Sequence, residues 1–224
     1  MTITELEING KSLPCHIRYK DIRHAYLKIQ PDLQLEISLP RNGSISADSL
    51  LKDKSRWIEK KVKELSGAKK IFNDGTILYG GENIKVEIRL AEQPYTSVIL
   101  GKKAITIYAN SSKKSNELLA DFLASQTLSY TRSKAVEFSQ ELGVTYSSIS
   151  TKKIRGWGYC TRNGNIIFNR KLICLPACLV DFIVFHELLH IKHFNHSRRF
   201  QNAMSKRFSD YKELKALLKS YMAN

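Results

Sequence analysis

The sequence predicts an α+β protein built from two domains. Residues 1–112 are expected to form a β-rich domain with one helix at about 46–66, and residues 113–224 a helical domain with a short antiparallel sheet. Three observations carry this prediction: apolar and polar residues alternate in the first half, helical periodicity dominates the second, and a polar stretch at 110–115 separates them.

The composition is that of an ordinary globular protein. Of the 224 residues, 42% are hydrophobic and 25% are charged, which is enough to build a hydrophobic core. No stretch approaches the roughly 20 apolar residues that a membrane helix needs. The first residues show no basic segment followed by an apolar one, so we expect no secretory signal and a cytoplasmic protein. The four cysteines form no C-x-x-C pair and are expected to be free thiols.

The net charge of +15 attracts polyanions such as nucleic acids, nucleotides or acidic protein surfaces. The lysines are scattered in small clusters without an interleaved aromatic pattern. Two interpretations stay open: a basic surface that contacts nucleic acid or nucleotides, and a lysine-rich surface that is merely solvated.

The amino-terminal elements follow from periodicity. Residues 17–20, 25–29 and 33–39 alternate as half-buried strands do, and Pro31-Asp32 is typical of a hairpin turn. At 46–66 the apolar spacing becomes helical, with Ser46 or Asp48 as the cap at the start and Gly67 at the end. Trp57 is interpreted as a core residue of this helix.

Strands return between residues 76 and 108, separated by glycine turns. Gly80-Gly81 is one such turn, and because no helix follows it we do not interpret it as a phosphate-binding loop. A long helix is expected from about Asn116 to Leu142, with Gly143 as its stop.

Two short strands are expected next, around Trp157 and around 166–168, joined by a two-residue Asn163-Gly164 hairpin turn. Pro176 fits the first turn of a helix that is apolar nearly all round and therefore buried. Residues 197–222 are expected to form one or two surface helices.

The buried helix carries the strongest chemical signal of the chain, His186-Glu187-Leu188-Leu189-His190. Histidines four apart share one helix face, so His186 and His190 can point at the same metal ion. Glu187 lies beside that face, where its carboxylate can take a proton from a water at the metal. Two histidines and a glutamate inside an apolar helix are costly without such a partner.

A third ligand needs a change of chain direction. His196 lies six residues past His190 and reaches the metal if the helix stops and the chain turns back, which Phe194-Asn195 permits. His193 is the alternative, but on a continuous helix it lies too far along the axis, and it suits a cation at the helix end. We therefore prefer His196. Three histidines leave a fourth position open, which is typical of catalytic zinc.

The motifs around this site resemble a known family. They are Gly156-Trp157-Gly158-Tyr159-Cys160, Gly164-Asn165-Ile166-Ile167-Phe168-Asn169, the helix motif, and Asn195-His196-Ser197-Arg198-Arg199-Phe200. Together they resemble the YgjP-like metallopeptidases, which belong to the wider WLM and SprT-like zincins. The resemblance spans nearly the whole chain. It implies a zincin-like catalytic domain at 113–224, zinc bound by His186, His190 and His196, and Glu187 as the general base.

Two positions depart from the family pattern R-W-G-S-C. Gly156 stands where the family has arginine, and Tyr159 stands where it has serine. The resemblance also implies an edge strand that pairs with a peptide, for which we expect 166–168, with an ordinary core strand as the alternative. Tyr211 is a candidate to stabilise the reaction intermediate, although packing alone would also explain it.

The predicted function is a zinc metallopeptidase acting on a protein or peptide substrate. Two alternatives stay open. The same metal site could hydrolyse nucleotides as a pyrophosphatase, or the protease could act on proteins held on DNA.

Overall fold

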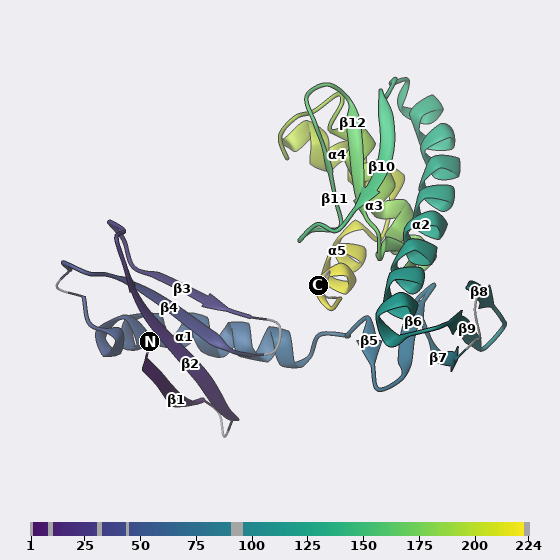
Figure 1. Cartoon of the computed structure of the whole chain (residues 1–224). Helices are drawn as coiled ribbons and strands as arrows, with labels where there is room; N and C mark the ends of the chain where they lie inside the picture. Colours follow the sequence, from purple (N-terminus) through teal and green to yellow (C-terminus); the bar gives the residue numbers. More distant parts are fainter. Residues whose placement is uncertain (1, 9–10, 31–32, 44, 91–95, 222–224) are drawn as a thin grey trace. The chain divides into compact units, whose positions relative to one another are not determined.

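The structure is a computed structural model that describes residues 2–8, 11–30, 33–43, 45–90 and 96–221 (Figure 1). The chain forms two compact units, Met1–Lys69 and Lys70–Asn224. The fold is mixed α+β, with five helices and three small mixed sheets among the described residues. The units divide between Lys69 and Lys70, whereas the sequence predicted a domain boundary at 112–113. The boundary lies earlier because the second sheet packs with the helices that follow it.

The first unit is a four-stranded sheet in the order β1-β2-β4-β3. Its strands are β1 (Thr2–Ile8), β2 (Lys11–Lys20), β3 (Tyr26–Ile29) and β4 (Leu35–Pro40). The outer pairs are antiparallel, and β2 pairs with β4 in parallel. The alternation in β4 buries Leu35, Ile37 and Leu39, as the period of two predicts. The turn predicted at Pro31-Asp32 lies outside the described residues.

The helix of this unit, α1 (Ala47–Ser66), begins where its cap predicts. The Ser46 hydroxyl accepts a hydrogen bond from the Ser49 amide at 3.1 Å, and Gly67 follows the last turn. Ile58 and Val62 form its buried face against the sheet. Trp57 was predicted to be a core residue, but its side chain is 44% exposed. The positions of the helix that face the core are those of Ile58 and Val62.

The second unit begins with a five-stranded sheet in the order β5-β6-β7-β9-β8. The strands are β5 (Phe72–Asn73), β6 (Thr76–Tyr79), β7 (Glu82–Leu90), β8 (Ser97–Leu100) and β9 (Ala104–Ala109). The tight turn Gly80-Gly81 joins β6 to β7, as expected, and both residues have positive φ.

This glycine turn holds the segment that leads into the buried helix. The Gly80 and Gly81 amides donate to the carbonyls of Ile173 and Cys174, each at 3.0 Å. A Cβ at Gly81 would lie 2.6 Å from Pro176 Cγ, a distance that real side chains do not tolerate. Glycine at residue 81 is therefore required by both its φ of 88° and this close approach.

A long helix, α2 (Ser112–Leu142), follows the second sheet. It begins four residues earlier than predicted because the Ser111 hydroxyl caps it, accepting from the Lys114 amide. Gly143 ends the helix with a φ of 60°, as predicted. Its buried face packs against α3 and the third sheet, beside which it runs in Figure 1.

The third sheet has the order β10-β12-β11, from β10 (Ser148–Lys152), β11 (Gly158–Cys160) and β12 (Asn165–Asn169). It is mixed rather than antiparallel, because β10 pairs with β12 in parallel. The predicted hairpin between β11 and β12 exists, but its loop has four residues, with Gly164 at a φ of 72°. The Gly164 amide donates to the Thr161 carbonyl, so the turn is longer than the two residues expected.

The remaining elements are the 3₁₀ turn η1 (Leu172–Cys174) and the helices α3 (Ala177–Leu189), α4 (Arg198–Arg207) and α5 (Tyr211–Lys219). Nine of the thirteen residues of α3 are buried, as its all-round apolar sequence predicts. The four cysteines are free thiols. No helix among the described residues is long and apolar enough to cross a membrane.

Candidate metal centre

The end of α3 places two imidazoles on one side of the helix. His186 lies in its last turn, and His190 follows its last residue with helical backbone. The centroids of the two rings are 4.9 Å apart. The chain makes one further turn, since the His193 amide donates to the Leu189 carbonyl at 2.9 Å. The four-residue spacing therefore places both imidazoles on the same face of the helix, as helix geometry predicts.

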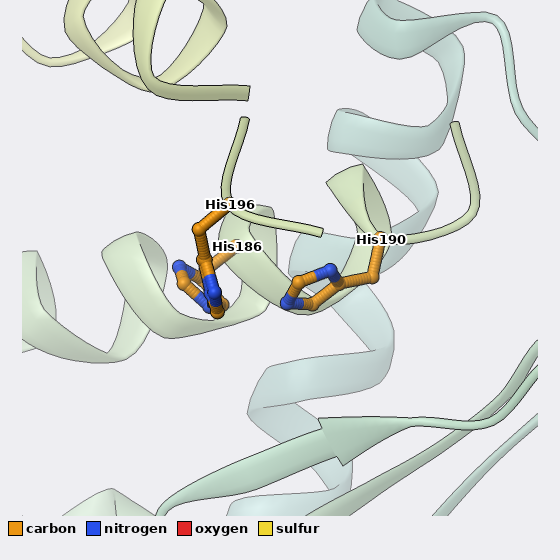
Figure 2. A group of neighbouring side chains, drawn as sticks. All are labelled: His186, His190 and His196. Carbon is orange, nitrogen blue, oxygen red and sulfur yellow. The ribbon is translucent and has the colours of Figure 1, made fainter. Parts of the chain in front are cut away.

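The chain then turns back and brings in a third imidazole (Figure 2). His196 Nε2 lies 3.1 Å from His186 Nε2. One ligand atom from each of His186, His190 and His196 lies within 4.8 Å of the others, so these residues can hold a metal ion. His193, the alternative weighed from the sequence, does not join this group.

His193 has a different part in the arrangement. Its carbonyl oxygen lies 3.0 Å from His190 Nδ1, which makes Nδ1 the protonated nitrogen of that ring. The Nε2 atom of His190 is then left as the nitrogen with a free lone pair. A hydrogen bond of this kind from the remote nitrogen is the usual support of a metal-binding histidine.

The donor set fits a tetrahedral divalent ion. Two nitrogens that each lie 2.0–2.1 Å from such an ion are about 3.3 Å apart, close to the spacing of the His186 and His196 nitrogens. Burial, with the charges of His190, His196 and Lys215, lowers the pKa of His186 to about 3. Burial also lowers the pKa of His190. Both rings are therefore neutral near pH 7, so each keeps one N–H and has a lone pair on its other nitrogen.

Phe200 forms a common apolar floor for the three imidazoles. Its ring centroid lies 4.9 Å from that of His186, 4.8 Å from His190 and 4.9 Å from His196, and the side chain is fully buried. It sits in the first turn of α4, which the Ser197 hydroxyl caps. Phe200 belongs to one of the family motifs in the sequence, but no role was predicted for it. Its contact with the imidazoles depends on the turn at 191–197, which the sequence alone does not reveal.

Glu187 is buried beside this group with 6% of its surface exposed. Burial raises the pKa of its carboxyl to about 8, although a hydrogen bond from the Cys160 amide lowers it in part. Cys160 belongs to β11, so this strand is in contact with the helix at the glutamate. A carboxyl with a pKa near neutral pH, in one cleft with His186 and His196, is suited to proton transfer.

The same strand leaves room for Glu187 through a glycine. A Cβ at Gly158 would lie 3.0 Å from Glu187 Cγ and 3.1 Å from Phe168 Cδ1. Side chains alternate along a strand, so Tyr159 projects from the opposite face and is 43% exposed. The tyrosine that departs from the family pattern therefore points away from Glu187.

Asn169 holds the loop before β11. Its side-chain amide donates to the carbonyls of Ile154 at 2.8 Å and Gly156 at 3.0 Å, and its Oδ1 accepts from the Lys171 amide. Gly156, the second departure from the family pattern, contributes only its backbone carbonyl to this hydrogen bond. Any residue at this position could provide the same carbonyl. The role of Asn169 was not predicted, because the sequence showed it only as the last residue of a strand motif.

A cleft of about 480 Å³ opens beside the imidazoles. Its walls are mostly apolar, and its lining residues are Trp157, Gly158, Phe182, Ile183, His186, Glu187, His196, Gln201, Tyr211, Lys215 and Leu218. Tyr211, a candidate from the sequence, lines this cleft and packs on Phe182 with ring centroids 5.8 Å apart.

The strand expected to accept a peptide is not an edge strand. Residues 166–168 lie in β12, which is the middle strand of its sheet and is paired on both sides. The edge strand next to α3 is β11, with Gly158 in the lining of the cleft. The alternative, an ordinary core strand, is confirmed, and the order of the three strands, which decides which one lies at the edge, has no local signal in the sequence.

These features agree with a comparison to known families. The family described as "YgjP-like, metallopeptidase domain" matches residues 23–221, so the chain belongs to this family. The class of protein is therefore that of metal-dependent peptidases. No curated protein matches the chain.

Proposed function

We propose that the protein is a zinc metallopeptidase in which His186, His190 and His196 hold the ion and Glu187 is the general base. The observation that carries the proposal is a cleft lined by the buried Glu187 together with His186 and His196, which with His190 have ligand atoms within 4.8 Å of one another. Three protein ligands and an open cleft are typical of a catalytic rather than a structural zinc site.

The chain's own residues have separable tasks in this mechanism. A bound zinc ion would supply a Lewis acid that polarises the scissile carbonyl and lowers the pKa of a water. Glu187 accepts a proton from that water and returns it to the leaving amine. A dication nearby favours the charged form of a carboxyl, so the raised pKa of Glu187 falls toward the range of a general base.

The apolar surroundings support these tasks. Phe200 packs beneath the three rings, and Phe182 and Trp157 exclude water from the walls of the cleft. In such surroundings, electrostatic interactions between the protein and a polar substrate are stronger than in water. We propose the outer edge of β11 at Gly158, which lines the cleft, as the place where an extended peptide pairs with the protein; the Cys160 amide on the same edge is already bonded to Glu187.

The test combines metal analysis with turnover. His186→Ala and His196→Ala should each lose the zinc that the purified wild-type protein retains, whereas Glu187→Gln should keep the zinc and lose peptide hydrolysis. Nucleoside triphosphates are assayed beside the peptides. Release of phosphate without peptide cleavage would reject the peptidase and favour the phosphohydrolase, and full activity of Glu187→Gln would reject the mechanism.

A basic cluster at the ends of β10 and β12 supports contact with nucleic acid as a second candidate property. Arg170 donates its amide to the Lys152 carbonyl at 3.1 Å, and the pKa of Lys171 is lowered by burial and by Arg170 and Lys153. None of these four cations forms an ion pair with another residue that the structure describes. Phosphate groups would compensate such a cluster.

Binding to single-stranded and duplex DNA at physiological salt tests this candidate. We expect salt-sensitive binding that weakens when Lys152, Lys153 and Arg170 are replaced by glutamine. Replacement of the exposed Lys102, Lys103 and Lys113 provides the matched control, since it removes the same number of charges. Absence of salt-sensitive binding by the wild-type protein would remove nucleic acid from the proposed partners.

A further inference from the structure

The wall of the cleft formed by α5 presents two polar groups. Tyr211 and Lys215 are four residues apart on this helix and therefore share one face. Both line the cleft together with His186 and Glu187. The Lys215 ammonium lies 5.7 Å from the centroid of the Tyr211 ring, which favours a position of the lysine along the cleft wall.

These two groups have no polar partner within the described chain. Neither the Tyr211 hydroxyl nor the Lys215 ammonium forms a hydrogen bond or ion pair with another described residue. Lys134 on α2 shows the contrast, since it lies 3.0 Å from Glu137 and 3.7 Å from Asp181. The α5 wall therefore offers donors that a bound substrate can reach in place of water.

The charge of the cleft points to the kind of acceptor. Among its lining residues Lys215 is the one lysine or arginine, and Glu187 is the one carboxylic acid. Glu187 is buried and already accepts a hydrogen bond from the Cys160 amide. An ammonium has three donors and no acceptor, so it is matched by an anionic oxygen, and hydrogen bonds between charged groups are the stronger ones.

We infer that Lys215, with Tyr211 beside it, binds a carboxylate of the peptide substrate and selects substrates that carry one close to the scissile bond. This inference rests on the proposed function and names its substrate class. The apolar remainder of the wall, including Phe182 and Leu218, fits an uncharged side chain next to that carboxylate. The carboxylate belongs either to the end of the peptide or to an Asp or Glu side chain, and the experiment separates the two.

The cleavage experiment compares matched peptides with the zinc-loaded full chain. One pair differs in a free or an amidated carboxyl terminus, and a second pair carries Glu or Gln on either side of the scissile bond. The wild-type protein should prefer one of the carboxylate peptides by about tenfold in kcat/KM, the value of one such hydrogen bond. Lys215→Gln should abolish the preference, and Lys215→Arg should retain most of it.

Lys212→Gln and Lys219→Gln are the matched controls, because both lysines are exposed on α5 and neither lines the cleft. The preference should persist in both. A wild-type protein that cleaves charged and neutral peptides equally, or a preference that survives Lys215→Gln, would overturn the inference while leaving the peptidase intact.

A binding measurement keeps the inference testable if no peptide is cleaved. The chain has two tryptophans, so Trp57→Phe leaves Trp157 in the cleft as the only tryptophan, and its fluorescence is excited selectively over that of the tyrosines. Zinc-loaded Glu187→Gln protein with this change is titrated with the same four peptides. Tighter binding of a carboxylate peptide that disappears in Lys215→Gln supports the inference even where the proposed hydrolysis fails. Equal binding of the four peptides contradicts it.

Discussion

Gly158 and Glu187 are in direct contact, with no space between them for a side chain. A Cβ at residue 158 would lie 3.0 Å from Glu187 Cγ and 3.2 Å from its Oε1. Real Cβ atoms are rarely found at such distances from their neighbours, so the strand or the glutamate would have to move. The position of the carboxyl therefore depends on a glycine that carries no functional group of its own.

We expect Gly158→Ala to lower kcat about 10- to 100-fold while the protein keeps its zinc, because a small displacement of a general base is costly to the reaction. The measurement is peptide hydrolysis together with metal content. Gly156→Ala is the control, since the nearest atom to its added Cβ is 3.9 Å away. Equal losses in the two variants would mean that the loop, and not the contact with Glu187, is sensitive.

Replacement of Phe200 should affect both stability and metal affinity. We expect Phe200→Ala to lower the free energy of unfolding by about 3–5 kcal/mol through loss of packing. It should also weaken zinc binding, because the three imidazoles lose the ring that all of them contact. Urea unfolding and competition with a zinc chelator measure the two effects.

Met204→Ala separates them, since Met204 is fully buried on the same helix and has no aromatic ring to stack on the histidines. It should lose a similar amount of stability and retain the affinity for zinc. Unchanged zinc affinity of Phe200→Ala would show that the contact of the Phe200 ring with the three imidazoles is not needed for metal binding.

The raised pKa of Glu187 predicts a pH dependence of the metal-free protein. The pKa is near 4.5 when the carboxyl is unperturbed and about 8 in the fold, so the unfolded chain releases this proton first. The contribution of Glu187 to stability is therefore present below pH 4.5 and declines as the pH rises toward 8. Glu187→Gln removes this decline.

The difference in the free energy of unfolding between Glu187→Gln and the wild type is measured in the presence of a chelator. This difference should shift in favour of Glu187→Gln as the pH rises from 4.5 to 8. Thermal unfolding across this range measures the difference. Glu213→Gln, which removes an exposed carboxylate on α5, is the control for the loss of one charge. A pH-independent difference between Glu187→Gln and the wild type would contradict the assigned burial effect.

The glycine turn between β6 and β7 gives a prediction far from the imidazoles. Gly81→Ala should be strongly destabilising, because its Cβ would lie 2.6 Å from Pro176 Cγ and its backbone has positive φ. Gly80→Ala has the same backbone handicap but open space around its Cβ, so it should cost only about 1 kcal/mol. Urea unfolding compares the two, and equal costs would show that contact with Pro176 is unimportant.

Local signals predicted much of this molecule. The helix ends at Ser46, Gly67 and Gly143 follow from capping chemistry, which acts within a few residues. The grouping of His186 with His190 follows from helix geometry alone. The position of His196 required only a short turn after the helix, which the sequence Phe194-Asn195 allowed.

Features that depend on distant contacts were not predicted. The polar strand β10 buries only Ile149 and shows no clear alternation, so its pairing with β12 has no local signal. The edge position of β11 depends on the order of three strands, and the exposure of Trp57 depends on which helix face meets the sheet. Such properties are set by packing between segments rather than by any one segment.

The hydrogen bonds from Gly80 and Gly81 to Ile173 and Cys174 join two regions separated by more than ninety residues. Inserting residues into this turn during evolution would displace the start of α3 and, with it, the histidines at its other end. Homologous chains should therefore vary in length elsewhere, for example in the loops at the far side of the second sheet, before they vary here. A recombinant fragment that begins at residue 113 would lack the turn altogether, and grafting the metal centre onto another scaffold would require this hairpin as well as the helix.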